Sequence, residues 1–195
     1  MGFETELKYA VAAPFSKDEL FSYPPVSENR GEIRTLTMRT EYLDTEDDLA
    51  KRLGITLRRR EENGKSVFCV KVNKKRSGAL SLRGEWNAEC DDIKEALTLL
   101  SKQGAPTELF LKEELVCVAR VSFTRWECEV TLPEMKFILS YDEGILGRDT
   151  AFSEIEIELV SGDVEKLLKF GEELKEHFPL REEALSKYAR ALLYK

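Results

Sequence analysis

The chain has 195 residues, of which 42% are hydrophobic and 34% are charged, and its formal net charge is −7 at pH 7. This length suits one substantial domain spanning residues 1–195, and the negative charge argues against binding to a long nucleic acid or to a membrane surface. No apolar run approaches the roughly 20 residues of a membrane span, and the N-terminus lacks a signal-peptide core, so we expect a cytoplasmic protein.

The cysteines and the single histidine argue against two common kinds of chemistry. Cys69, Cys90, Cys117 and Cys128 are scattered without a CxxC pair, which indicates reduced thiols in a cytosolic protein. His177 lies in a predicted helix, far in sequence from every cysteine. This pattern disfavours a zinc site, and it equally disfavours a mechanism that depends on a histidine general base.

Alternation of apolar and polar residues, which is typical of β-strands, recurs along most of the chain. The predicted strands are 3–9, 33–43, 54–61, 66–72, 80–88, 116–125, 126–131, 135–142 and 152–160, and the predicted helices are 17–21, 45–53, 91–102, 163–177 and 181–193. Asn63-Gly64 and Pro133-Glu134 mark hairpin turns, and residues 24–31 form a predicted loop. Short turns between the strands favour an antiparallel sheet closed into a barrel, an α+β fold that is mainly β.

Carboxylates occupy every second position in two predicted strands near opposite ends of the chain. The first strand carries Glu4 and Glu6 followed by Lys8, and the second carries Glu154, Glu156 and Glu158. Because successive side chains of a strand point to opposite faces, each set lies on one face of its strand. Carboxylates in such a row repel one another, so their face either is open to water or holds a cation.

Basic side chains share the polar faces of other predicted strands. Arg58 and Arg60 lie on one face, Lys71 alternates with valines, and Arg83 shares a face with Glu85. If the apolar faces pack under helices, these charged faces turn into the barrel, where they require water or a ligand. Arginine and lysine suit phosphate oxygens, and carboxylates hold Mg²⁺ or Mn²⁺. The combination predicts a ligand that is a phosphate chain with a divalent metal.

Several segments in order along the chain resemble the CYTH domains, also called triphosphate tunnel metalloenzymes. The N-terminal Glu4-Thr5-Glu6-Leu7-Lys8 resembles the ExExK signature of that family. The other matching segments are Tyr42-Leu43-Asp44-Thr45, Leu57-Arg58-Arg59-Arg60, Lys71, Arg83-Gly84-Glu85, Phe123-Thr124-Arg125, Asp142-Glu143-Gly144, Ser153 to Leu159 with its ExExE pattern, and Ser186-Lys187-Tyr188. The resemblance covers essentially the whole chain, and the motifs are specific in combination.

The resemblance implies an eight-stranded antiparallel closed barrel, a triphosphate tunnel, with helices outside and a C-terminal helix near one mouth. The implied phosphate-binding residues are Lys8, Arg58, Arg60, Lys71, Arg83, Arg125 and Lys187, and the implied ligands of Mg²⁺ or Mn²⁺ are Glu4, Glu6, Asp142, Glu154, Glu156 and Glu158. The expected catalytic set is Glu4, Glu6, Lys8, Glu85, Glu154 and Glu156, with Arg83 and Glu85 as supporting charges. Arg39, Arg120 and Glu127 are weaker candidates.

The expected activity is metal-dependent hydrolysis of a small triphosphate by a monomer or homodimer, and the absence of an appended domain favours inorganic triphosphate. Two alternatives within the family are a thiamine triphosphatase and a class IV adenylyl cyclase, although no adenine pocket is recognisable. A third alternative is a binding module for polyphosphate or a nucleotide that does no catalysis. Such a module has no need for so many carboxylates, so the acidic residues favour an enzyme. An RNA 5′-triphosphatase is disfavoured by the net charge of −7.

Overall fold

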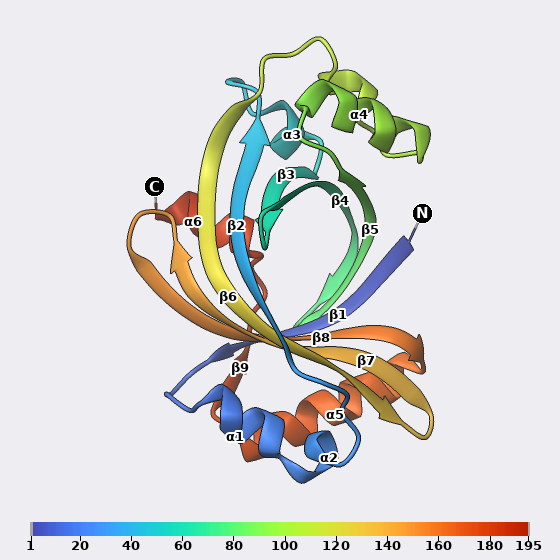
Figure 1. Ribbon diagram of the computed structural model, residues 1–195, viewed down its shortest axis with the longest axis vertical. Helices are drawn as coiled ribbons and strands as arrows, with labels where there is room; N and C mark the ends of the chain where they lie inside the picture. The colour runs from blue at the N-terminus through green and yellow to red at the C-terminus, as the bar shows by residue number, and fades with distance from the viewer. Residues whose placement is uncertain (1, 195) are drawn as a thin grey trace.

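Eight antiparallel strands close into a barrel because the first strand pairs with strands from both ends of the sheet. The computed structural model describes the backbone of residues 2–194 and the side chains of residues 4–72 and 77–194. The strands in this part of the chain are β1 (Gly2–Val11), β2 (Arg34–Asp44), β3 (Ile55–Glu62), β4 (Lys65–Ser77), β5 (Leu80–Glu89), β6 (Val116–Leu132), β7 (Met135–Leu146), β8 (Thr150–Gly162) and β9 (Leu180–Glu182). The order of the eight barrel strands is β5-β4-β3-β2-β6-β7-β8-β1, β1 also pairs with β5, and β9 pairs with β1 outside the barrel. Figure 1 shows the resulting ring of strands, which confirms the predicted barrel.

All but one of the helices in the described part of the chain lie at two opposite sides of this ring. They are α1 (Lys17–Ser22), α2 (Pro24–Ser27), α3 (Leu49–Arg52), α4 (Ile93–Lys102), α5 (Val164–His177) and α6 (Lys187–Leu193), together with a 3-10 turn, η1 (Glu108–Phe110). In Figure 1, α3 and α4 lie above the barrel, α1, α2 and α5 lie below it, and α6 lies beside β6. In the part of the chain that the structure describes, no helix is long and apolar enough to span a bilayer.

The upper apolar layer covers the outer face of β3, β4 and β5. Phe68 and Val70 of β4 are buried there beside Leu57 of β3, and they pack against Leu97 and Leu100 of α4. The neighbouring residues on β4 point the other way, into the barrel, because side chains alternate along a strand. When the apolar residues at every second position pack under the helices, the charged residues between them therefore point into the barrel.

The lower apolar layer covers the outer face of β1, β7 and β8. Leu7 and Ile157 are fully buried under Leu167 and Leu174 of α5. Asp163 caps this helix by accepting a hydrogen bond from the backbone of Glu165, as its position after a glycine predicts. The residues of β1 and β8 that alternate with this layer are the glutamates of the two acidic strands.

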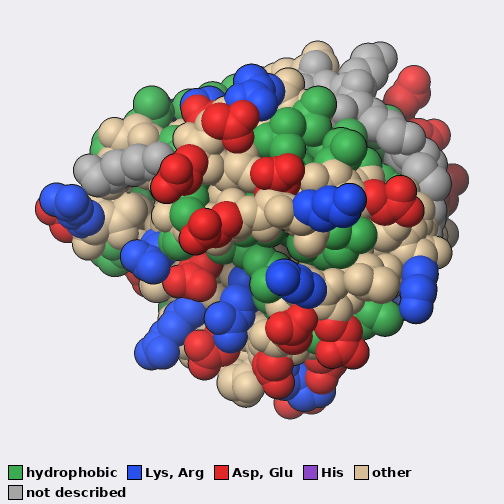
Figure 2. Space-filling view, turned by 90° about the horizontal axis from the view of Figure 1, so that it is seen from above, with side chains coloured by type: hydrophobic (Ala, Val, Ile, Leu, Met, Phe, Trp, Pro, Cys, Tyr) green, Lys and Arg blue, Asp and Glu red, His purple; other side chains and the backbone are tan. Residues whose placement is uncertain are grey.

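The outer surface carries mixed charge. Figure 2 shows acidic and basic side chains interspersed on the face seen from above, with apolar side chains between them. Outside the barrel, Arg120 pairs with Glu41 at 3.1 Å. We therefore place the concentrated charge of this molecule inside the barrel.

Some element boundaries differ from the sequence prediction. Residues 181–193 do not form one helix, because Leu180–Glu182 adds β9 to the edge of β1 before Ser186 caps α6. Of the predicted helix 45–53, only α3 forms, since the buried Asp44 accepts hydrogen bonds from the backbone of Ala50 and Lys51 in a tight turn. The predicted strands 116–125 and 126–131 are one strand, β6, and the predicted loop 24–31 contains the short helix α2.

Candidate active site in the barrel interior

A cavity of about 460 Å³ runs into the barrel and is lined mainly by charged side chains. Its charged lining residues are Glu4, Glu6, Lys8, Arg58, Arg60, Lys71, Arg83, Glu85, Arg125, Glu156, Glu158 and Lys187. They come from six strands and from α6, and every one of them is a residue that the sequence analysis assigned to the site. Uncharged residues complete the wall, among them Tyr42, Thr56, Asn87 and Tyr188.

The register of the sheet brings opposite charges together across neighbouring strands. Lys8 of β1 lies opposite Glu156 of β8, and Lys71 of β4 lies opposite Glu85 of β5. Directly opposed residues of an antiparallel pair have Cβ atoms only about 4.5–5.5 Å apart. Strand pairing alone therefore interleaves cations and carboxylates around the interior.

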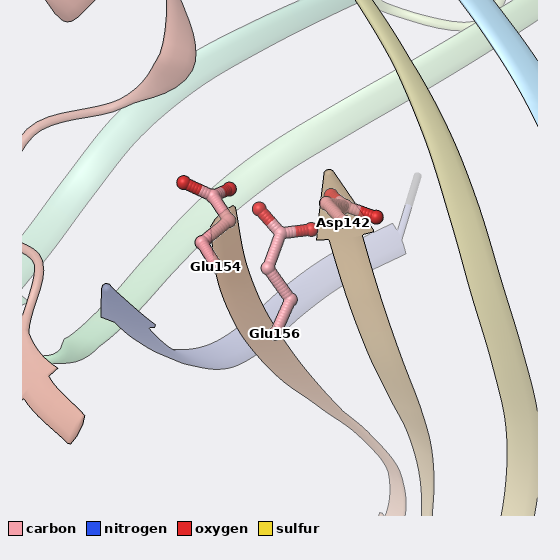
Figure 3. A group of neighbouring side chains, drawn as sticks. All are labelled: Asp142, Glu154 and Glu156. Atoms are coloured by element: carbon pink, nitrogen blue, oxygen red, sulfur yellow. The ribbon is translucent and has the colours of Figure 1, made fainter. Parts of the chain in front are cut away.

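Three carboxylates gather at one side of the barrel. Asp142 of β7 lies opposite Glu154 of β8, and Glu156 is the next inward residue of β8. Oxygens of all three lie within 4.8 Å of one another. In Figure 3 the three side chains extend toward the same region from two adjacent strands. We call this group the acidic triad.

The acidic triad is surrounded by basic side chains. Arg125 binds Asp142 through two hydrogen bonds of 2.7 Å each and also contacts Glu156. The Lys187 ammonium lies 2.7 Å from Asp142 and 3.0 Å from Glu156, and it contacts Glu154 as well. Such pairing is what makes three buried carboxylates tolerable in a protein interior.

A second group of charges lies across the cavity on β1, β3, β4 and β5. Lys71 sits between two carboxylates, 2.7 Å from Glu4 and 2.8 Å from Glu85. Arg58 lies 3.7 Å from the same Glu85. A lysine that bridges two glutamates lets both carboxyl groups approach each other closely.

Glu6, Arg83 and Lys8 connect the two groups along the floor of the cavity. The Arg83 guanidinium lies 2.7 Å from Glu6 and donates a 2.7 Å hydrogen bond to Ser81. Lys8 lies 4.0 Å from Glu6 and is almost completely buried. The three residues therefore form a continuous charged surface between the acidic triad and Lys71.

Burial and neighbouring charge drive the pKa values of these groups apart. Burial raises the pKa of Glu4 to about 8, and the nearby Glu6 and Glu85 add to the shift. Burial also acts on Glu85, but Lys71 and Arg58 outweigh it and hold the pKa of Glu85 below its ordinary value. Burial lowers the pKa of Lys8. Glu4 is therefore a carboxyl group that titrates near neutral pH in the ligand-free protein.

The same contrast occurs within the acidic triad. Burial raises the pKa of Glu154 despite its basic neighbours. Lys187 and Arg125 overcome the effect of burial at Glu156 and hold its pKa well below the ordinary value. Two carboxylates on one strand thus differ in their readiness to carry charge, and perturbation of this kind is characteristic of functional sites.

Two residues of the expected site lie behind the cavity wall. Asp142 and Glu154 are completely buried and do not line the cavity, whereas Glu156 does. Arg39 and Arg120 are exposed on the outer face of the barrel, and they line a separate surface groove. Glu127 is largely buried and lies 4.0 Å from Arg125, outside the cavity lining.

Arg190 was not predicted as a site residue, and Tyr42 and Tyr188 were recognised only as members of the family motifs. Arg190 contacts Glu154 and lies 3.7 Å from Glu183. The rings of Tyr42 and Tyr188 are 4.9 Å apart at the cavity wall. The spacing of Arg190 three residues after Lys187 places both on one helix face, and this was the available signal.

The donor set fits a hard divalent cation. Mg²⁺ and Mn²⁺ prefer oxygen ligands, and the acidic triad brings carboxylate oxygens from Asp142, Glu154 and Glu156 within reach of a single ion. The same oxygens are now bridged by basic side chains, so an ion at this position would replace contacts of Lys187 or Arg125. Glu6 and Glu158, which lie opposite each other on β1 and β8, supply further carboxylates nearby.

Comparison with known proteins identifies the family and the fold of this chain. The family model of the CYTH domain matches residues 2–192. A structure from Hippeastrum, described as a candidate adenylyl cyclase with a dominant triphosphatase activity, is 23% identical with a TM-score of 0.69, covering 95% of this chain and 93% of its own. A candidate adenylate cyclase from Bacillus halodurans is 20% identical with a TM-score of 0.58, covering 97% of this chain and 98% of its own. A protein from Pyrococcus horikoshii is 21% identical with a TM-score of 0.59, covering 97% and 98%. At these identities the structures establish a shared fold.

Proposed function

Because this chain belongs to the CYTH domain family, we propose that it hydrolyses a triphosphate inside its barrel with the help of Mg²⁺ or Mn²⁺. Inorganic triphosphate is the substrate that we favour, and residues 1–195 act as one such domain. The observation that carries the proposal is a cavity of about 460 Å³ that is lined by both basic and acidic side chains.

The balance of charge in the cavity supports a metal-bound polyphosphate. Among the described residues, seven basic and five acidic side chains line the wall. A single terminal phosphate group already carries about −1.5 to −2 at pH 7, so a chain of three exceeds this small basic surplus. Divalent cations that enter with the substrate would offset the remainder, and the carboxylates would hold them.

Each set of side chains has a distinct role in this proposal. The phosphates are bound by Lys8, Arg58, Arg60, Lys71, Arg83, Arg125 and Lys187. The metal is held by carboxylates drawn from Glu4, Glu6, Asp142, Glu154, Glu156 and Glu158, and it supplies charge stabilisation for the phosphoryl group. The catalytic set is Glu4, Glu6, Lys8, Glu85, Glu154 and Glu156.

Positioning and electrostatic stabilisation account for most of the catalysis, as in other phosphoryl transfers. Arg58 and Lys71 hold the phosphate chain from β3 and β4, opposite the acidic triad. The side chains of Arg58 and Lys71 are largely buried, so these fixed charges act more strongly than they would in water. Glu4 has a pKa of about 8, so it is largely protonated at neutral pH in the ligand-free protein, and binding of a divalent cation would displace this proton and free the carboxylate.

One observation favours a second candidate substrate. The paired rings of Tyr42 and Tyr188 line the cavity, and they offer an apolar surface beside the phosphate-binding residues. A triphosphate that carries an organic group, such as thiamine triphosphate or ATP, would use this surface. This second candidate corresponds to a thiamine triphosphatase or an adenylyl cyclase.

The test is phosphate release from inorganic triphosphate, ATP and thiamine triphosphate, each with Mg²⁺, Mn²⁺ or EDTA. We expect rapid, metal-dependent cleavage of inorganic triphosphate and little release from the other two. Glu156→Gln should abolish turnover while the circular dichroism spectrum stays that of the wild type, because the change keeps the shape of the side chain and removes its charge. Formation of cyclic AMP and pyrophosphate from ATP would support a cyclase instead. Tight binding of triphosphate without turnover would support the alternative that the protein is a binding module without catalytic activity.

A further inference from the structure

We propose that Arg190 is a positioning residue that keeps Lys187 available to bind a phosphate. The proposal rests on the function proposed above, in which Lys187 is one of the phosphate-binding groups. Arg190 does not line the cavity, and it would act through Glu154 and Lys187.

The two basic residues of α6 share one buried carboxylate. Lys187 contacts Oε1 of Glu154, and Arg190 contacts Oε2 of the same group. Glu154 is completely buried, and Lys187 and Arg190 are only 8% and 9% exposed. The spacing of three residues places Lys187 and Arg190 on the same side of the helix. Glu154 therefore has a counter-ion on each of its oxygens.

Lys187 has competing partners that it must leave in order to bind a phosphate. Its ammonium contacts Asp142 and Glu156 as well as Glu154. Asp142 and Glu156 each have Arg125 as a second basic partner. Glu154 has Arg190 in that role. Each carboxylate of the acidic triad thus retains one guanidinium when the lysine moves.

Without Arg190, the departure of Lys187 would leave Glu154 as a buried charge without a close partner. Breaking a buried ion pair by removing one partner is strongly unfavourable, because it leaves a buried charge without compensation. The lysine would then be held on Glu154, and its transfer to a phosphate would become less favourable. Arg190 keeps Glu154 paired after Lys187 has moved. The effect of Arg190 on phosphate binding therefore depends on the presence of Lys187.

The surroundings of Arg190 hold it in place independently of Lys187. Its second guanidinium nitrogen lies 3.7 Å from Glu183, in the segment that joins β9 to α6. The guanidinium carbon of Arg190 lies 5.3 Å from the centre of the Phe152 ring. The backbone N–H of Glu183 donates a hydrogen bond to the backbone carbonyl of Lys8 in β1. Arg190 is therefore fixed to the barrel wall, whereas the ammonium of Lys187 lies at the cavity surface.

The experiment is a double-mutant cycle on the affinity for inorganic triphosphate, measured by isothermal titration calorimetry in EDTA. The variants are Arg190→Met, Lys187→Met and the double variant. We expect Arg190→Met alone to weaken binding by about tenfold, which corresponds to about 1.4 kcal/mol. We expect the double variant to bind no more weakly than Lys187→Met alone, because Arg190 acts through that lysine. Arg190→Lys should recover part of the affinity lost in Arg190→Met, since it keeps the charge beside Glu154 but loses the nitrogen that faces Glu183.

Arg181→Met is the matched control, because Arg181 lies on β9 with an exposed side chain and is not part of the cavity lining. Its affinity should equal that of the wild type. If Arg190→Met does not fold, Arg190→Gln replaces it in the cycle, since the amide keeps a hydrogen-bond donor near Glu154 and removes the charge. The circular dichroism spectrum and melting temperature of each variant establish folding.

Two results would overturn the inference while leaving the proposed function intact. One is wild-type affinity in the Arg190 variant, and the other is a full additional loss when it is combined with Lys187→Met. A full additional loss in the double variant would mean that Arg190 acts independently of Lys187, either by long-range attraction of the ligand's charge or by supporting the overall structure. Failure of the wild type to bind inorganic triphosphate, with or without Mg²⁺, would instead contradict the proposed function itself.

Discussion

Burial determines how each charged residue of the barrel can take part in chemistry. Glu156 and Glu154 are neighbours on the same face of β8, yet Glu156 reaches the cavity and Glu154 is enclosed beneath α6. The alternation of residues in the sequence predicts that both point inward. It does not reveal that a helix more than thirty positions away covers one of them, since this depends on the placement of α6.

The location of individual charged residues inside the barrel was nonetheless largely predictable. Every second residue of an amphipathic strand faces inward, so Arg58, Arg60 and Lys71 were assigned to the interior from alternation, and the structure places them there. Arg120 and Arg125 are five positions apart, which put them on opposite faces, and only Arg125 lines the cavity. Arg190 was missed because its partner, Glu154, is distant in sequence.

At the same scale, the pKa of Glu4 predicts a specific pH dependence of stability. Burial raises this pKa from 4.5 to about 8, so between these values the folded protein holds a proton that the unfolded chain has released. The resulting stabilisation is complete below pH 4.5 and is lost as the pH rises to 8. For one proton, the unfolding free energy changes by at most about 1.4 kcal/mol per pH unit.

Urea unfolding in EDTA at pH 5.5 and pH 8 measures this effect, with Glu4→Gln as the reference because glutamine does not titrate. We expect the unfolding free energy of the wild type, relative to Glu4→Gln, to fall between pH 5.5 and pH 8. A difference that stays constant over this interval would show that Glu4 has an ordinary pKa.

At the scale of elements, the helices fix the direction in which each strand faces. The position of α5 on β1 depends on Gly171, which packs against Leu7 and Tyr9. Strand and helix identities followed from periodicity, and Asn63-Gly64 forms the predicted turn with both residues at positive φ. The predicted helix 181–193 was wrong because pairing of β9 with β1 is a tertiary interaction that local periodicity does not report.

Gly171→Ala tests how closely α5 must approach the barrel. An added Cβ would lie 2.2 Å from the Tyr9 hydroxyl and 2.7 Å from a methyl group of Leu7, and both residues are fully buried. Overpacking of this kind costs about 1–3 kcal/mol, which we expect to outweigh the gain of up to about 1 kcal/mol from alanine in a helix. The unfolding free energy in urea should therefore fall.

Gly31→Ala is the matched control, because the nearest atom to its added Cβ is 3.8 Å away and its φ is not in the left-handed region. Its unfolding free energy should stay within about 0.5 kcal/mol of the wild type. Equal stability of both variants would mean that α5 can shift away from β1 at little cost.

At the scale of the whole molecule, closure of the sheet creates the enclosed charge. β1 pairs with β5 along Gly2 to Leu7 and with β8 along Glu6 to Ala10, which joins the two ends of the sheet. The sequence indicates a barrel through short turns and alternation, but it does not specify which edges meet. That pairing places the acidic strands β1 and β8 side by side, and only β5 separates them from the basic strands β4 and β3.

The central claim is that the inside of this barrel, and not its outer surface, binds a triphosphate. Calorimetric titration with inorganic triphosphate compares the wild type with Arg58→Met inside the barrel and Arg39→Met on its outer face. Charge-assisted hydrogen bonds contribute about 1.5–3 kcal/mol, so we expect Arg58→Met to weaken binding by at least about tenfold. Arg39→Met should bind one triphosphate per chain with wild-type affinity. Unchanged affinity in Arg58→Met together with weakened binding in Arg39→Met would place the site outside the barrel and contradict this account.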